Sequence, residues 1–239
     1  MGRVLVVDDD ETIGDVVRRY LERDGLAVEV VADGTAALER ALADPPDVVV
    51  LDLMLPGVSG LDVCRQLRAA GAGGAGGYVP IVMLTALGEE SDRVLGLELG
   101  ADDYVTKPFS PRELALRVQS VLRRSREPAP PPGRPAMLRD GDLVVDVAAR
   151  RATLADRPLL LTVREFDLLA FLLAHPGQAF TRAELLERVW GWTFGDQSTV
   201  TVHVRRLREK LEPGAAAPRV ATVWGVGYRY DPVAPERVP

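Results

Sequence analysis

The chain contains 239 residues, of which 47% are hydrophobic, enough for one large domain or two ordinary ones. No apolar run approaches the roughly 20 residues needed to cross a bilayer. The start, MGRVLVVDDD, does not resemble a signal peptide, because its short apolar run leads straight into acidic residues. Cys64 is the only cysteine, which excludes an internal disulfide. These features predict a cytoplasmic protein that does not enter a membrane.

The formal net charge of −6 is unevenly distributed along the sequence. Residues 1–124 carry 13 basic and 21 acidic side chains, a net charge of −8, whereas residues 125–239 carry 16 and 14, a net charge of +2. An acidic half joined to a mildly basic half suggests different partners for the two, and nucleic acid is a candidate partner for the second.

Residues 3–124 alternate short apolar runs with helical patterns, such as the recurrence of Leu114, Val118 and Leu122 at helical spacing. The apolar runs predict strands at 3–8, 26–31, 47–52, 80–85 and 103–106. Strands that alternate with helices favour right-handed crossovers, so we expect an α/β fold with a doubly wound, five-stranded parallel sheet. Ligands in such a sheet bind outside the carboxyl ends of the strands.

Four of the apolar runs end in a reactive polar residue. VLVVDD ends in Asp8 and Asp9, DVVVLD in Asp52 and IVMLT in Thr85, and DYVTKP contains Lys107. Because the strand ends share one edge of a parallel sheet, these side chains are expected to form one site. Carboxylates suit Mg²⁺, an aspartate can attack phosphorus to give an acyl phosphate, and a lysine can hold a phosphoryl oxygen. The sequence therefore predicts a site for a divalent cation and a phosphoryl group.

Any single aspartate in this set has a simpler explanation, because aspartate after a strand is often a turn residue or a helix N-cap. The complete set at four strand ends is less easily explained in this way. Lys107 adds an independent indication. The chain has 27 arginines and only two lysines, Lys107 and Lys210, and a lysine supplies a compact point charge.

The segment 125–137, SREPAPPPGRPAM, contains five prolines and is typical of an extended linker. The earlier stretch 71–77, GAGGAGG, is a low-complexity insert to which we assign no chemistry. Residues 138–233 are expected to form an α+β domain, with short strands followed by three helices and a glycine-containing hairpin. The helices are expected at 163–174, 182–190 and 197–212, and the hairpin turn at Gly225 and Gly227.

The helix expected at 197–212 has two different faces. An apolar stripe contains Val200, Val204, Leu207 and Leu211. The opposite side carries Ser198, Thr201, Val202, Arg205, Arg206 and Glu209, with Arg208 at the flank. Arginine can read guanine or bind phosphate, and a valine can contact a thymine methyl group. A cationic helix face is more often plain solvated surface, but helix, helix, basic helix and hairpin is the layout of a winged helix-turn-helix.

The motifs VLDLMLPGVSG, MLTA, TKPF, TVTVHVRRLREKLEP and TVWGVGYR together resemble those of a two-component response regulator of the OmpR/PhoB subfamily. Residues 1–124 resemble the flavodoxin-like receiver domain, whose strand order is 2-1-3-4-5. Residues 138–231 resemble the winged helix-turn-helix effector domain. The resemblance implies a DNA-binding transcriptional regulator, not a turnover enzyme, that accepts its phosphoryl group from a sensor histidine kinase.

Within the receiver domain, the resemblance makes Asp52 the phosphoacceptor. It implies that Mg²⁺ or Mn²⁺ is bound by Asp9, Asp52 and the carbonyl of Met54, with Asp8 acting through water. Thr85 and Lys107 would contact the phosphoryl oxygens, and Tyr104 would be an aromatic switch that rotates inward with Thr85. The Lys107–Pro108 peptide bond would be cis.

The resemblance also implies double-stranded DNA as a partner, bound at direct repeats. Four residues would face the major groove, namely Thr201, Val202, Arg205 and Arg206. Arg208 and Thr222 would contact phosphate, and His203 would either pack or contact phosphate. The wing, with Gly225, Gly227 and Tyr228, would approach the minor groove, and the loop 191–196 matches one associated with RNA polymerase contact.

Phosphorylation would favour a homodimer formed through the fourth helix, fifth strand and fifth helix of the receiver domain. The charged positions that match this interface are Arg93, Asp102, Asp103, Glu113, Arg117 and Arg124. Leu87 and Gln119 depart from the usual residues and bear on the strength of the dimer. Ser198 and Trp224 depart from them in the effector domain, where Trp224 replaces a frequent arginine and could pack under the wing.

Two other functions compete with this one. The first is an aspartyl-nucleophile phosphatase, which needs a second acid or base near Asp52, whereas Leu53, Met54 and Leu55 follow it. The second is a regulator of the same build that works without phosphorylation. Such regulators usually lack part of the acidic set or the lysine, and this chain has all of them.

Overall fold

The computed structural model describes residues 2–72, 78–86, 100–126, 137–192, 197–211 and 218–233. The chain divides into two compact units, Met1–Arg126 and Glu127–Pro239, which are treated separately below. The predicted linker, 125–137, lies mostly outside the described residues. Among the described helices, none has the length and apolar character required to cross a membrane.

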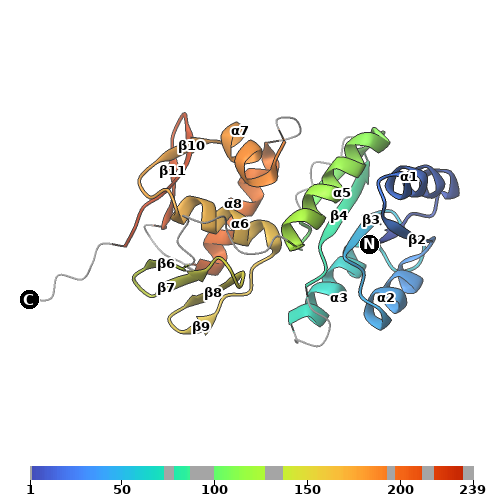
Figure 1. The fold of residues 1–239 in the computed structure, drawn as a ribbon, viewed down its shortest axis with the longest axis horizontal. Helices are drawn as coiled ribbons and strands as arrows, with labels where there is room; N and C mark the ends of the chain where they lie inside the picture. Colours follow the sequence, from blue (N-terminus) through green and yellow to red (C-terminus); the bar gives the residue numbers. More distant parts are fainter. Residues whose placement is uncertain are drawn as a thin grey trace, which may run out of the picture. The chain divides into compact units, whose positions relative to one another are not determined.

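The N-terminal unit contains the predicted parallel sheet (Figure 1). Its strands are β1 (Arg3–Val7), β2 (Ala27–Val31), β3 (Val48–Asp52), β4 (Ile81–Ala86) and β5 (Asp103–Lys107). They lie in the order β2-β1-β3-β4-β5 and all pair in parallel, which confirms the predicted fold class. Each strand begins and ends within one residue of the predicted run. The cause is clearest in β3, whose five residues are all buried, because a strand buried on both faces is a continuous apolar run.

Among the described residues, helices cover both faces of this sheet (Figure 1). They are α1 (Glu11–Arg23) and α5 (Pro111–Arg126) on one face, and α2 (Gly34–Ala43) and α3 (Gly60–Ala72) on the other. Val4 and Val50 of the sheet share a buried cluster with Val17 of α1 and Val118 of α5. The carboxylate of Asp10 caps α1 by accepting from two backbone N–H groups, so only two of the three aspartates in VVDDD remain for the strand-end site.

The C-terminal unit has the predicted α+β composition. An antiparallel sheet contains β6 (Met137–Asp140), β7 (Leu143–Asp146), β8 (Arg151–Leu154) and β9 (Arg157–Pro158). It is followed by α6 (Val163–Leu173), α7 (Arg182–Leu185), the π-helical turn η1 (Leu186–Trp190) and α8 (Ser198–Leu211). A second sheet contains β10 (Ala179–Thr181), β11 (Val220–Val223) and β12 (Gly227–Tyr230), in the order β10-β12-β11.

Two local features differ from the sequence prediction. The helix expected at 182–190 is a short α-helix that continues as a π-helical turn. Gly227 lies in strand β12 and not in the hairpin turn. Its backbone presses on β10 so closely that a Cβ atom would lie 2.1 Å from the carbonyl oxygen of Phe180. Glycine is therefore required there for close strand packing.

Candidate functional site: an acidic pocket and a helix-and-wing surface

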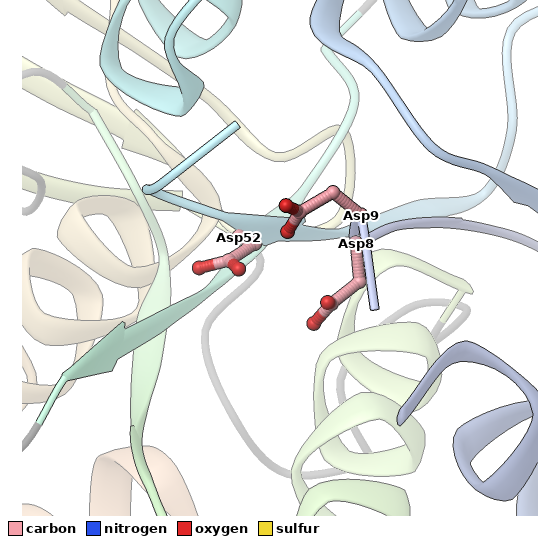
Figure 2. Close-up of side chains that lie close together, drawn as sticks. All are labelled: Asp8, Asp9 and Asp52. Carbon is pink, nitrogen blue, oxygen red and sulfur yellow. The ribbon is translucent and has the colours of Figure 1, made fainter. Parts of the chain in front are cut away.

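Three carboxylates meet at the carboxyl ends of two neighbouring strands (Figure 2). Asp8 and Asp9 follow β1, and Asp52 ends β3, which pairs with β1. One carboxylate oxygen from each lies within 4.8 Å of the others. Asp8 and Asp52 are buried, whereas Asp9 is exposed. The structure thus brings together the acidic residues that the strand ends predict.

Lys107 connects this acidic cluster to the end of β5. Its Nζ donates to Oδ2 of Asp52 at 2.6 Å and to Oδ2 of Asp8 at 2.8 Å. Burial lowers the pKa of Lys107, but the two carboxylates outweigh it, and the pKa is raised. Burial raises the pKa of Asp8 by more than its hydrogen bonds from Lys107 and the N–H of Asp10 lower it. The Lys107–Pro108 peptide is cis, as the resemblance implies.

Thr85 lies at the end of β4, the strand that pairs with β3. Its side chain is fully buried, and its hydroxyl has no hydrogen-bond partner among the described residues. A buried hydroxyl without a partner is costly, so Thr85 is a candidate to bind a ligand at the strand ends. Tyr104 of β5 is also buried, and its role as a switch stays a prediction.

The turn after Asp52 is shaped by backbone contacts. The N–H of Met54 donates to Oδ1 of Asp52 at 3.3 Å, while the Met54 side chain is exposed. At Gly60, the first residue of α3, a Cβ atom would lie 2.0 Å from the carbonyl oxygen of Asp52. Leu53 and Leu55 are buried and apolar, so the residues directly after Asp52 provide no acid or base.

The donor set of this pocket fits a hard divalent cation. Three carboxylates and one ammonium leave a formal charge of −2 at the strand ends. Oxygen ligands of this kind are preferred by Mg²⁺ and Mn²⁺, whereas the thiolates and imidazoles that favour zinc or copper are not part of this cluster.

The predicted dimer positions are mostly paired within the chain. Asp103 is fully buried, and Nη1 of Arg117 lies 3.0 Å from it, while Nη2 of Arg117 lies 2.8 Å from Glu113. Asp102 is fully buried and accepts from Arg68 at 3.2 Å and from the N–H of Ile81 at 2.9 Å. Asp102, Asp103 and Arg117 are therefore buried and paired within the unit, and their assignment to a dimer interface stays a prediction.

The other predicted dimer positions differ in how much of them the structure describes. Glu113 is partly exposed, with 33% of its side-chain surface accessible. Arg93, Leu87 and the side chain of Arg124 lie outside the described residues. Gln119 links α5 to the end of α1, because its Nε2 donates to Oδ2 of Asp24 at 2.7 Å.

Helix α8 exposes fewer of the predicted DNA-contacting residues than its sequence suggests. Thr201 and Arg205 are exposed, and Arg205 pairs with Glu209 at 3.0 Å. Arg206 is buried and lies 2.9 Å from Glu165 of α6, and Val202 is also buried. The assignment of Arg206 and Val202 to an exposed reading face was therefore wrong.

His203 packs inside the domain, which is one of the two roles expected for it, and does not face the DNA-contacting surface. Its side chain is completely buried, and its Nδ1 hydrogen-bonds to the carbonyl oxygen of Thr199 at 2.8 Å. Its ring packs edge-on against Trp190 with centroids 5.1 Å apart. Burial lowers the pKa of His203 to about 4, so the ring is neutral near pH 7 and does not reach a phosphate.

Arg208 and Thr222 join α8 to the wing. Nε of Arg208 donates to the carbonyl oxygen of Val220 at 2.6 Å, and Nη2 donates to Oγ1 of Thr222 at 2.8 Å. Tyr228 is buried, and its hydroxyl donates to Oγ1 of Thr201 at 3.3 Å. Three residues expected to touch DNA therefore hold the wing against the helix.

Two further residues lie near this surface. The sequence did not predict a role for Arg182, and it left the position of Trp224 open. Arg182, at the start of α7, donates to Oγ1 of Thr201 at 3.2 Å and to the Tyr228 hydroxyl at 3.4 Å. Its position at the start of a helix was the only signal for Arg182 in the sequence, and no motif surrounds it. Trp224, for which packing under the wing was one of the two alternatives, is 90% exposed. Of the loop 191–196, residues 193–196 lie outside the described residues.

Comparisons with known proteins cover both units. The family model of the response regulator receiver domain matches residues 4–119, and that of the transcriptional regulatory protein C-terminal domain matches residues 156–230. The sensory transduction protein RegX3 of Mycolicibacterium smegmatis is 43% identical over 97% of this chain and 100% of its own. The DNA-binding response regulator MtrA of the same species is 48% identical over 96% of this chain and 97% of its own.

Solved structures show the same architecture. A variant of RitR superposes with a TM-score of 0.73 at 25% identity, over 98% of this chain and 100% of its own. The OmpR/PhoB homolog DrrB of Thermotoga maritima superposes with a TM-score of 0.51 at 33% identity, over 97% of this chain and 99% of its own. With the acidic pocket and the helix-and-wing domain, these matches show that the chain belongs to the OmpR/PhoB family of two-component response regulators.

Proposed function

We propose that Asp52 accepts a phosphoryl group from a phosphohistidine of a sensor histidine kinase, and that this modification controls DNA binding. The observation that carries the proposal is the hydrogen bond of Lys107 to Asp52 beside two further carboxylates, at the sheet edge where β4 also ends in Thr85, whose hydroxyl has no partner among the described residues. An oxygen of Asp52 attacks phosphorus, the phosphorus–nitrogen bond breaks, and the histidine nitrogen keeps the electron pair. The product is an acyl phosphate on Asp52.

The other residues of the pocket bind and orient the phosphoryl group. Lys107 has its ammonium 2.6 Å from Asp52 and would hold one phosphoryl oxygen, and the Thr85 hydroxyl would hold another. Asp9, Asp52 and the Met54 carbonyl would hold Mg²⁺ or Mn²⁺, with Asp8 acting through water. When bound, the metal neutralises negative charge on the phosphoryl oxygens.

The phosphorylated receiver would change the surface that includes β5 and α5. Movement of Thr85 toward a phosphoryl oxygen, with Tyr104 inside, would stabilise one arrangement of this surface and favour a homodimer. Two effector units would then bind direct-repeat DNA through Thr201 and Arg205. Contact with RNA polymerase through the loop 191–196 is part of the same proposal.

A phosphatase function is disfavoured by the surroundings of Asp52. Rapid hydrolysis needs a general base or acid beside the acyl phosphate, and Leu53 and Leu55 are buried apolar residues while Met54 is an exposed thioether. The named relatives RegX3 and MtrA are a sensory transduction protein and a DNA-binding response regulator.

Labelling with radioactive acetyl phosphate in the presence of Mg²⁺ tests the assignment. We expect stoichiometric, alkali-labile label on the natural chain and no label on Asp52→Asn. Asp15→Asn, which removes an exposed carboxylate of α1, is the matched control and should label normally. Label that persists on Asp52→Asn would refute the assignment, and sustained release of phosphate from a phosphomonoester would favour the phosphatase.

A further inference from the structure

The arginines of the N-terminal unit differ in whether their side chains have a partner. Most of the described ones pair with carboxylates inside the unit, as Arg40 does with Glu29 and Arg65 does with Asp62. The exceptions among the described side chains form neither an ion pair nor a hydrogen bond, and they are Arg19, Arg23, Arg112 and Arg123. Positive charge without a partner is unexpected in residues 1–124, whose net charge is −8.

These exceptions all lie on two adjacent helices. α1 and α5 pack side by side on one face of the sheet (Figure 1). Arg19 and Arg23 are four residues apart on α1, and Arg112, Leu116 and Arg123 follow one another at spacings of four and seven on α5. Residues at these spacings share a helix face, and all of them are exposed. The two helices therefore present a basic surface that also contains an exposed leucine.

A cleft of about 500 Å³ lies between α1 and α5. It is lined from the α1 side by Tyr20, Arg23 and Asp24, and from the α5 side by Arg112, Leu116 and Gln119. Small-molecule sites have volumes of about 300–1,000 Å³ and combine apolar surface with a few polar groups. The cleft has both the size and the composition of such a site.

Arg23 is held in a defined orientation inside this cleft. Its guanidinium carbon lies 4.8 Å from the centre of the Tyr20 ring, so the phenol covers one face of the guanidinium. A guanidinium plane also stacks on a flat ligand, and its N–H groups fit both oxygens of a carboxylate. Asp24 accepts a hydrogen bond from Gln119 at 2.7 Å. Two guanidiniums and the carboxylate of Asp24 give the lining a formal charge of +1.

We propose that the cleft between α1 and α5 binds a small organic anion with a flat apolar body, of the class of aromatic carboxylates. The ring packs against Leu116 and stacks on the guanidinium of Arg23, while Arg112 binds the carboxylate from the opposite wall. The ligand thus supplies the anionic partner that both arginines lack among the described residues. The cleft shares no lining residue with the acidic pocket, so the inference does not depend on phosphorylation of Asp52.

Titration of the full-length chain into 2-naphthoate, followed by the fluorescence anisotropy of the naphthalene ring, tests the proposal. We expect saturable binding that Arg23→Gln and Arg112→Gln each weaken about tenfold, the loss typical of removing one contact to a charged group. Arg65→Gln, which removes an exposed arginine of α3, is the matched control and should bind as the natural chain does. Unchanged affinity in both cleft variants, or no saturable binding, would overturn the proposal.

Two analogues test the chemical class of the ligand. 2-Naphthamide keeps the ring without the charge, and acetate keeps the charge without the ring. Each should compete with 2-naphthoate at least about tenfold more weakly than unlabelled aromatic carboxylate does, because each lacks one of the two kinds of contact. Equal affinity for acetate would show that the ring has no role, equal affinity for 2-naphthamide would show that the arginines have none, and either result contradicts the proposal.

Photolabelling with 4-benzoylbenzoate, an aromatic carboxylate that cross-links where it binds, locates the site directly. Label should appear on peptides from α1 and α5, and excess 2-naphthoate should prevent it. Label confined to the C-terminal unit would overturn the proposal, and absence of label would leave an acidic protein surface as the partner of these arginines and overturn it as well. Arg23→Gln and Arg112→Gln should be as stable in urea as the natural chain, because both side chains are exposed.

Discussion

Lys107 and Asp52 are 55 residues apart in the chain, yet the ammonium of one lies 2.6 Å from Oδ2 of the other. The parallel sheet produces this pair, because β3 and β5 both end at the edge where the two side chains meet. The same ammonium lies 2.8 Å from Asp8. The ammonium of Lys107 therefore neutralises part of the negative charge that a metal ion would bind.

Lys107→Ala should separate metal binding from phosphorylation. Removing the ammonium frees Asp8 and Asp52, so Mg²⁺ should bind more tightly. The gain should be at least about 1 kcal/mol, or about fivefold in affinity, which is the Coulomb energy of two unit charges 4 Å apart in water. Phosphorylation should slow, because no cation remains to hold the phosphoryl oxygen. Calorimetric Mg²⁺ titration and acetyl phosphate labelling measure the two effects. Lys210→Ala, which removes the other lysine, is the control and should leave the Mg²⁺ affinity unchanged. Weaker Mg²⁺ binding in Lys107→Ala would contradict the account.

Arg117→Ala should destabilise the N-terminal unit strongly. The substitution leaves the buried carboxylate of Asp103 without its cation at 3.0 Å, and breaking a buried pair typically costs about 3–5 kcal/mol. Urea unfolding followed by circular dichroism measures the loss. Arg112→Ala, an exposed position on the same helix, should change stability by less than about 0.5 kcal/mol. Equal stabilities of the two variants would show that the buried pair contributes nothing.

The strand-end site could be predicted from the sequence, whereas the accessible face of α8 could not. Asp8, Asp52 and Lys107 follow apolar runs, and the shared edge of a parallel sheet is enough to bring them together. Arg205 and Arg206 are adjacent arginines on one amphipathic helix, and only the position of Glu165 on α6 determines which is buried. That tertiary contact has no periodic signature in the sequence.

Arg205→Ala and Arg206→Ala should therefore have opposite phenotypes. Arg205→Ala should weaken DNA binding and reduce the salt slope by about one, with stability unchanged, because the side chain is exposed. Arg206→Ala should lower the free energy of unfolding by about 3 kcal/mol, because it removes a partner of the buried carboxylate of Glu165. Fluorescence anisotropy with DNA and urea unfolding distinguish the two. If Arg206→Ala is as stable as the natural chain but binds DNA more weakly, Arg206 contacts DNA after all.

His203 should make the C-terminal unit sensitive to mild acid. Its folded pKa of about 4 lies below the ordinary value of 6.5, so between these values the unfolded chain binds a proton that the folded chain does not. Stability is full above pH 6.5 and decreases as the pH falls through this window, by up to about 3 kcal/mol.

The emission of buried Trp190 and Trp192 reports this unfolding in urea at pH 7 and pH 4.5. His203→Asn lacks the titrating ring, so its stability should fall less over the same interval, by about 2–3 kcal/mol. Identical pH dependence in the natural chain and His203→Asn would show that His203 is protonated without cost.

The affinity of the full-length chain for a duplex that it has selected from a random-sequence library, with and without beryllofluoride and Mg²⁺, tests the central claim most directly. Phosphorylation of Asp52 should shift the chain toward its DNA-binding dimer, so beryllofluoride should tighten binding about tenfold or more, a typical allosteric coupling. Asp52→Asn should bind equally with and without the reagent, and Asp15→Asn should respond as the natural chain does. Unchanged affinity of the natural chain on beryllofluoride treatment, with Asp52 occupied, would contradict the account and identify a regulator that binds DNA independently of phosphorylation.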